Sequence, residues 1–194
     1  MRVTLTLLLT ALLGGLLAGG FSLLQPVRSA ASARIIFTEA GASGLDPYTA
    51  LKASERLAQS LSELLYSSTM FENILLRAHG FDAKYFPADE LERRALWHQT
   101  IWSSVAAGTG LMTVTAYHPN AEQARLLVQA AADELVDKAP IFFGAGVRAQ
   151  IVDPAVVWPG IARPDYLKNV TLGALAGLLL GLGWLLVRNF KRGT

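Results

Sequence analysis

The chain has 194 residues, 52% of them hydrophobic, and a formal net charge of +2. The basic excess is confined to the two ends, because residues 28–168 hold thirteen Lys and Arg against fifteen Asp and Glu, a balance that argues against a nucleic-acid-binding surface. The absence of cysteine excludes disulfides, thiolate metal sites and cysteine nucleophiles.

Two long uncharged segments bracket the chain. No charged side chain occurs in residues 3–26 or in residues 169–187. At about 1.5 Å rise per residue, a helix over either segment is long enough to cross a hydrocarbon core roughly 30 Å thick. We therefore predict transmembrane helices over 3–26 and 169–187, with a water-facing region between them.

The charges that flank the two spans predict the orientation. Basic residues next to a span mark its cytoplasmic side. Arg188, Lys191 and Arg192 follow the second span and form a predicted cytoplasmic tail over 188–194, and Arg2 gives a weaker signal before the first span. Both termini are therefore expected in the cytoplasm and the middle of the chain outside it.

The first span has a second interpretation. Ala31-Ser32-Ala33 matches the small-residue pattern of a signal-peptidase site, so the span could be a cleaved export signal. The uncharged run is longer than the roughly 7–15 residues of a signal core, and Arg2 is a weakly basic start. These features favour a retained anchor.

Residues 28–153 are predicted to form one α+β domain, with a small sheet covered by helices. Alternating apolar residues predict strands over 34–38, 111–117 and 147–152. Helical spacing predicts one long helix over 47–78, a short one over 88–97 and a third from the cap Asn120 to Ala139. Asp46 and Asn120 are the predicted N-caps of the first and third of these helices.

No catalytic or metal-binding constellation is recognisable. His79, His98 and His118 are far apart and match no metal-ligand spacing, so no metal site is expected. Gly108-Thr109-Gly110 lacks the lysine and hydroxyl of a phosphate-binding loop and is expected to be a turn. We predict no cofactor and no enzymatic activity.

Three prolines lie between the last predicted strand and the second span. Pro154, Pro159 and Pro164 fix φ and cannot donate backbone hydrogen bonds. They predict an extended, semi-rigid connector over 154–168, with an ordinary linker as the alternative.

Three glycines lie four residues apart along the second span. Gly173, Gly177 and Gly181 form a ridge of the kind that lets membrane helices approach closely. We expect this ridge to bring together the second spans of neighbouring protomers. The alternative is the ordinary tolerance of membrane helices for glycine.

The four tryptophans are expected to serve two purposes. Trp158 and Trp184 lie near opposite boundaries of the second span and are predicted interfacial anchors. Trp97 and Trp102, in the middle of the domain, are expected in the core or in a protomer contact rather than in a sugar-binding platform.

Three segments resemble one known family. They are ASERLAQSLSELLYSSTMFENIL within Tyr48–Leu75, GTGLMTVTAYHPNAEQARLLVQAAADEL over Gly108–Leu135, and IVDPAVVWPGIARPDYLKN with the following GALAGLLLG. In this order the chain resembles the Wzz-type polysaccharide co-polymerases, the chain-length determinants, and the related transmembrane modulators of bacterial tyrosine kinases. The chain departs from the family in its wider proline spacing, in Asp165 after Pro164, and in lacking a long stalk or a fused kinase.

The resemblance implies a bacterial plasma (inner) membrane protein without enzymatic activity. Such proteins form ring-like homo-oligomers that set the length and export of O-antigen, capsule or exopolysaccharide together with a polymerase. The modulators instead activate a separate cytoplasmic tyrosine kinase, which is the alternative function. An enzyme that modifies glycans is the third possibility, and the missing catalytic constellation argues against it.

Overall fold

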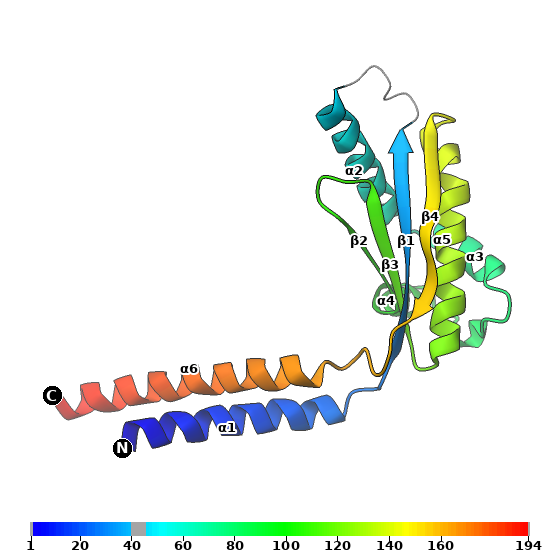
Figure 1. Ribbon diagram of the computed structural model, residues 1–194. Helices are drawn as coiled ribbons and strands as arrows, with labels where there is room; N and C mark the ends of the chain where they lie inside the picture. The colour runs from blue at the N-terminus through cyan, green and yellow to red at the C-terminus, as the bar shows by residue number, and fades with distance from the viewer. Residues whose placement is uncertain (1, 40–45, 194) are drawn as a thin grey trace. The chain divides into compact units, whose positions relative to one another are not determined.

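The computed structural model describes the backbone of residues 2–39 and 46–193, and the side chains of residues 3–38 and 46–188. The chain divides into two compact units, an α+β domain over residues 28–160 and a helix pair formed by the residues before and after it (Figure 1). The elements are α1 (Arg2–Leu23), β1 (Ser29–Glu39), α2 (Pro47–Leu64), α3 (Ser68–Arg77), a 3-10 turn (Ala83–Tyr85), α4 (Glu90–Thr100), β2 (Ile101–Val105), β3 (Leu111–His118), α5 (Ala121–Phe143), β4 (Val147–Val157) and α6 (Tyr166–Gly193).

The four strands form one antiparallel sheet in the order β2-β3-β1-β4. The first strand in sequence therefore lies inside the sheet, between β3 and β4 (Figure 1). The predicted α+β class, with a small sheet covered by helices, is confirmed. Among the residues that the structure describes, α1 and α6 are long and apolar enough to cross a membrane.

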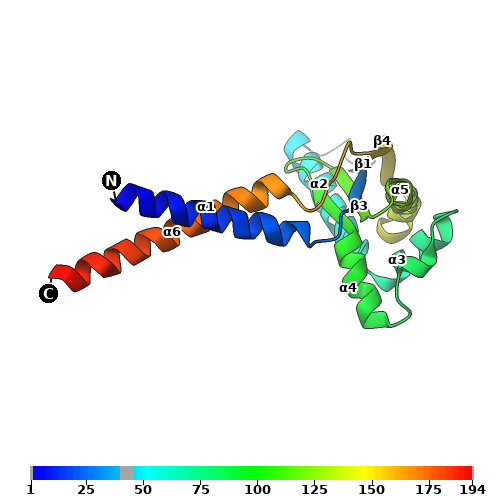
Figure 2. The ribbon, with the colours of Figure 1, turned by 90° about the horizontal axis from the view of Figure 1, so that it is seen from below.

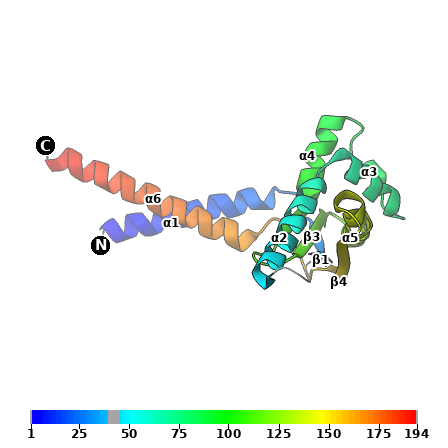
Figure 3. The same cartoon turned by 90° about the horizontal axis from the view of Figure 1, so that it is seen from above.

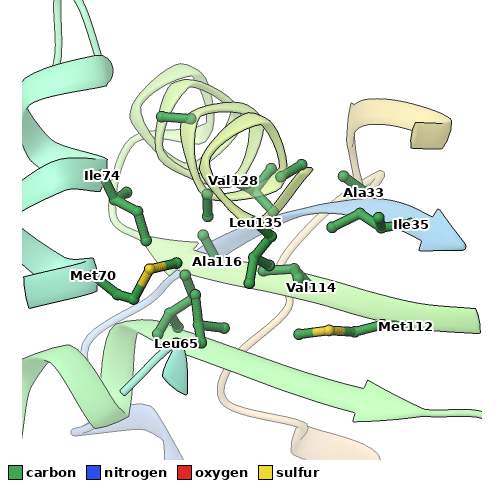
Figure 4. Close-up of a cluster of buried hydrophobic side chains, with 14 of the residues drawn as sticks. Ala33, Ile35, Leu65, Met70, Ile74, Met112, Val114, Ala116, Val128 and Leu135 are labelled. Atoms are coloured by element: carbon green, nitrogen blue, oxygen red, sulfur yellow. The ribbon is translucent and has the colours of Figure 1, made fainter. Parts of the chain in front are cut away.

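The helices of the domain pack on one face of the sheet. In β1 the side chains of Ala31, Ala33, Ile35 and Phe37 are almost completely buried, whereas Arg34 and the residues at even positions after it are exposed. The buried side chains of β1 and β3 meet apolar residues of α3 and α5 (Figure 4). The opposite face of the sheet, at least along β1 and β4, remains open to solvent.

The long helix expected over 47–78 is wrong, because the chain breaks at Leu65–Ser67 into α2 and α3. Ser67 supplies the reason, since its hydroxyl accepts a bond from the Met70 backbone N–H and so caps a new helix. The break also lets the Leu65 carbonyl accept a 3.0 Å bond from the buried Trp97 indole. The expected caps are confirmed: Asp46 and Asn120 each accept two backbone N–H groups in the first turn of their helices.

Strand β2 and several element boundaries also differ from expectation. Strand β2 was not predicted, because Ser103 and Ser104 obscure the alternation of apolar residues, although Ile101 is fully buried. The predicted first strand begins five residues later than β1 does, because alanine is a weak strand former. Ala30, Ala31 and Ala33 are nonetheless fully or almost fully buried. The predicted third helix also ends before Pro140, which α5 accommodates in its last turn.

The position of Ala31-Ser32-Ala33 bears on the export-signal interpretation. All three residues belong to β1 and pair with β3, and the first two also pair with β4. Cleavage after Ala33 would remove five residues from an interior strand of the sheet. The geometry thus favours a retained first helix.

Candidate functional site: the glycine-packed helix pair

The glycines of the second apolar helix face the first apolar helix of the same chain. A Cβ atom added at Gly177 or Gly181 would collide with Thr10, and one at Gly173 would collide with Ala18 and with the Gly14 carbonyl oxygen. The two helices lie side by side in Figure 1 and cross in Figures 2 and 3. The ridge expected to join neighbouring protomers is therefore occupied by α1.

Helix α1 contributes Gly14 to the contact with the glycines of α6, a residue that was not predicted to take part. A Cβ atom added at Gly14 would collide with the Gly173 carbonyl oxygen and come within 3.0 Å of the Gly177 Cα atom. The same addition at Gly15 would find its nearest neighbour, the Val170 carbonyl oxygen, at 3.5 Å, an ordinary contact. The glycine pairs at 14–15 and 19–20 could have indicated a packing face on this helix. Of these four glycines, Gly14 lies at the closest approach to α6.

A polar contact joins the helices at the end nearest the domain in sequence. The Asn169 side-chain amide donates a 2.6 Å hydrogen bond to the Ser22 hydroxyl, and Ser22 is almost fully buried. In an apolar environment such a bond between helices adds to the packing of small residues. Asn169, which matches a glycosylation sequon, is thus engaged with α1.

The three prolines of the expected connector lie in three different structures. Pro154 belongs to β4, which continues to Val157, so the strand extends past the expected start of the connector. Its backbone is tolerated there because β4 is an edge strand whose pairing with β1 shifts on both sides of Asp153. Pro159 follows the strand, and Pro164 is buried immediately before Asp165, whose carboxylate caps α6 by accepting the Lys168 N–H at 3.0 Å. Only the residues after Val157 form a connector.

The basic end of α6 is continuous with its apolar part. Helix α6 runs to Gly193, so the expected tail over 188–194 is helical through that residue. Arg188 is exposed, whereas the side chains of Lys191 and Arg192 lie outside the described residues.

The three histidines are separated in the domain. His98 stacks on Tyr66 with ring centroids 4.7 Å apart, His118 is buried beside Tyr85, and His79 is exposed. Within residues 2–39 and 46–193, no three His, Asp or Glu side chains are grouped so as to hold a metal ion.

The tryptophans are divided between core and surface. Trp97 is in the core, as expected, with its indole bonded to Leu65. Trp102, on β2, and Trp158, just after β4, are exposed. Trp184 is exposed on α6.

Backbone contacts that only glycine permits hold α1, which precedes the domain in sequence, against α6, which follows it. The arrangement can tie a domain to a bilayer and transmit a change in helix packing. No family model matches the chain, and no curated protein matches it.

Proposed function

We propose that the chain is a two-pass membrane protein that regulates the length and export of a bacterial surface polysaccharide. In this proposal it acts without catalysis, as an oligomeric co-polymerase beside a polymerase or export complex. Both termini lie in the cytoplasm and the α+β domain lies outside the inner membrane.

The observation that carries the proposal is the close packing of α1 and α6 at Gly14, Gly173 and Gly177. A helix pair of this kind needs both helices, which argues that the first is an anchor that stays with the protein. The three sequence segments that resemble the chain-length determinants, together with the two apolar helices, support the choice of polysaccharide as the regulated product.

The test is the distribution of surface-polysaccharide lengths in a deletion strain and in strains complemented with variants. We expect deletion to change the distribution and the parent chain to restore it. Gly177→Leu, which meets α1, should fail to restore it, whereas Gly183→Leu, which has open space around it, should succeed. An unchanged distribution in the deletion strain would contradict the proposal.

The second candidate is an activator of a separate cytoplasmic tyrosine kinase. The unbroken course of α6 from Tyr166 to Gly193 favours it, because a continuous helix can carry a change at the span to a basic cytoplasmic end. Loss of kinase activity on deletion of residues 190–194, with unchanged polymer length, would select this function over the first.

A further inference from the structure

We propose that the open face of the sheet binds an oligosaccharide chain directly. The open face is defined here as the side away from α2 and α5, and its central residues are Ser32, Arg34, Trp102, Thr113 and Asp153, with Trp158 folded onto it. The inference deepens the proposed function, on which it rests for the kind of polymer involved.

Two tryptophans expose their rings on this face. Trp102 of β2 is 50% exposed, and Trp158 is 42% exposed. The Trp158 indole N–H donates a 2.8 Å bond to the Ser32 hydroxyl, and its backbone N–H donates a 2.8 Å bond to the Ala30 carbonyl. The second ring is therefore held against the sheet in one orientation, with its polar atom already satisfied and its surface available.

The strand register places Trp102 in the same row across the sheet as Ser32, the residue whose hydroxyl accepts the bond from the Trp158 indole. Trp102 is opposite Thr115, which is almost fully buried, and Thr115 is opposite Ser32, which accepts the Trp158 bond, so the exposed parts of this row are the two rings. Two strand spacings separate Trp102 from Ser32, which is about 10 Å. An extended saccharide that crosses the strands could therefore touch both rings, and the electron-rich faces of indole attract the C–H groups of sugar rings.

The neighbouring row is polar throughout. Ser104 is opposite Thr113, Thr113 is opposite Arg34, and Arg34 is opposite Asp153. Arg34 and Asp153 form a 3.1 Å ion pair, and both side chains are half-exposed. Hydroxyl, guanidinium and carboxylate groups together donate and accept hydrogen bonds, as sugar hydroxyls require. This row lies about 7 Å from the tryptophan row, two residues along a strand.

The composition favours a saccharide over a second copy of the chain. The centres of protein interfaces are depleted of charged residues, whereas here an ion pair lies in the middle of the face. Exposed aromatic rings beside the half-exposed Arg34–Asp153 pair suit a ligand that is itself both apolar and hydroxylated.

The experiment measures binding of short oligosaccharides cut from the source organism's own surface polysaccharide. The full-length chain in lipid nanodiscs is titrated by calorimetry. We expect saturable binding that weakens roughly tenfold or more in Trp102→Ala and in Trp158→Ala, since a truncated aromatic anchor costs at least about that factor. Trp184→Ala, which removes an exposed tryptophan from α6, is the matched control and should bind as the parent does.

The outcomes separate this inference from the proposed function. Absence of binding by a folded parent, or equal affinities for the parent and both sheet variants, would overturn the inference. Loss of self-association in Trp102→Ala without any saccharide binding would overturn it in favour of a second copy on this face. Trp-dependent binding with an unchanged polymer length in the deletion strain would support the inference and contradict the proposed function.

Discussion

The α+β domain and the helix pair differ in the kind of packing that holds each of them together internally. The domain buries large side chains, among them Trp97, Phe37 and Leu61, against one another. The helix pair approaches through glycines, so that at Gly14 and Gly177 the contacts are with backbone atoms. In water, burial of apolar area stabilises the core, whereas lipid gives apolar side chains no such preference for each other and close backbone approach matters more.

This difference means that the two regions should fail under opposite substitutions. Removing side-chain volume should damage the domain, and adding volume should damage the pair.

The largest effect is expected for Trp97→Ala. The ring contacts Phe71 edge-on at 5.0 Å between centroids, and its indole N–H bonds to the Leu65 carbonyl. Loss of a fully buried tryptophan costs about 3–5 kcal/mol. We expect a corresponding fall in the free energy of unfolding of the domain, measured by urea titration with near-ultraviolet circular dichroism.

Trp102→Ala is the matched control for that measurement, because it removes an exposed ring from the same domain. We expect a much smaller change in the free energy of unfolding. Equal losses in the two variants would contradict the assignment of Trp97 to the core.

The next effect is expected for Gly177→Leu in the helix pair. The added side chain must displace α1, and overpacking of this kind costs about 1–3 kcal/mol. Because the chain has no cysteine, a disulfide between Ser22→Cys and Asn169→Cys reports the packing cleanly. We expect the yield of this disulfide in nanodiscs to fall in Gly177→Leu and to stay high in Gly183→Leu. Equal yields would show that the glycine contacts do not hold the pair.

A smaller effect is expected for Asn120→Ala. The Asn120 side chain accepts bonds from the backbone N–H groups of Glu122 and Gln123 at the start of α5. Loss of such a cap costs about 1 kcal/mol, and Asn120→Asp should recover most of it. Urea unfolding measures the change in the domain, while the engineered disulfide in the helix pair should be unaffected. A parallel loss of both would show that the two regions are coupled.

The smallest expected effect is a dependence of domain stability on pH. Burial lowers the pKa of His118 below its usual range, the hydrogen bond that the ring donates to the Asn120 carbonyl oxygen and the charge of Asp82 oppose the shift, and the Arg28 charge adds to it. A histidine whose pKa is lower in the folded than in the unfolded state contributes its full stabilisation at pH values above the unfolded-state pKa of about 6.5. This contribution is lost as the pH falls through the folded-state pKa.

We therefore expect the urea concentration at the unfolding midpoint of the domain to decrease as the pH is lowered from about 7.5 to about 5.5. The decrease should be smaller in His118→Phe. The ring nitrogen Nε2, which is buried without a hydrogen-bond partner, disappears in that variant. Identical pH slopes for the parent and His118→Phe would remove His118 as the cause. The disulfide yield in the helix pair should show no matching trend.

Features that depend on local chemistry could be predicted from the amino-acid sequence. Residues 3–26 and 169–187 lack charges over membrane-spanning length, and α1 and α6 largely cover them. Asp46 and Asn120 were recognisable as caps, because an N-cap needs only a side-chain acceptor beside its own first turn. The α+β class followed from the alternation and helical spacing of the apolar residues.

Tertiary structure decided the features that depend on what lies across from a residue. The glycine ridge was visible in the sequence, but its partner was not, because a small-residue face fits any helix that approaches it. Strand β2 and the early start of β1 depend on pairing with β3, which supplies hydrogen bonds that local propensity does not encode. Likewise, Trp102 and Trp158 lie on the same open face only because the sheet brings β2 beside β3 and β3 beside β1, whose Ser32 accepts the Trp158 bond.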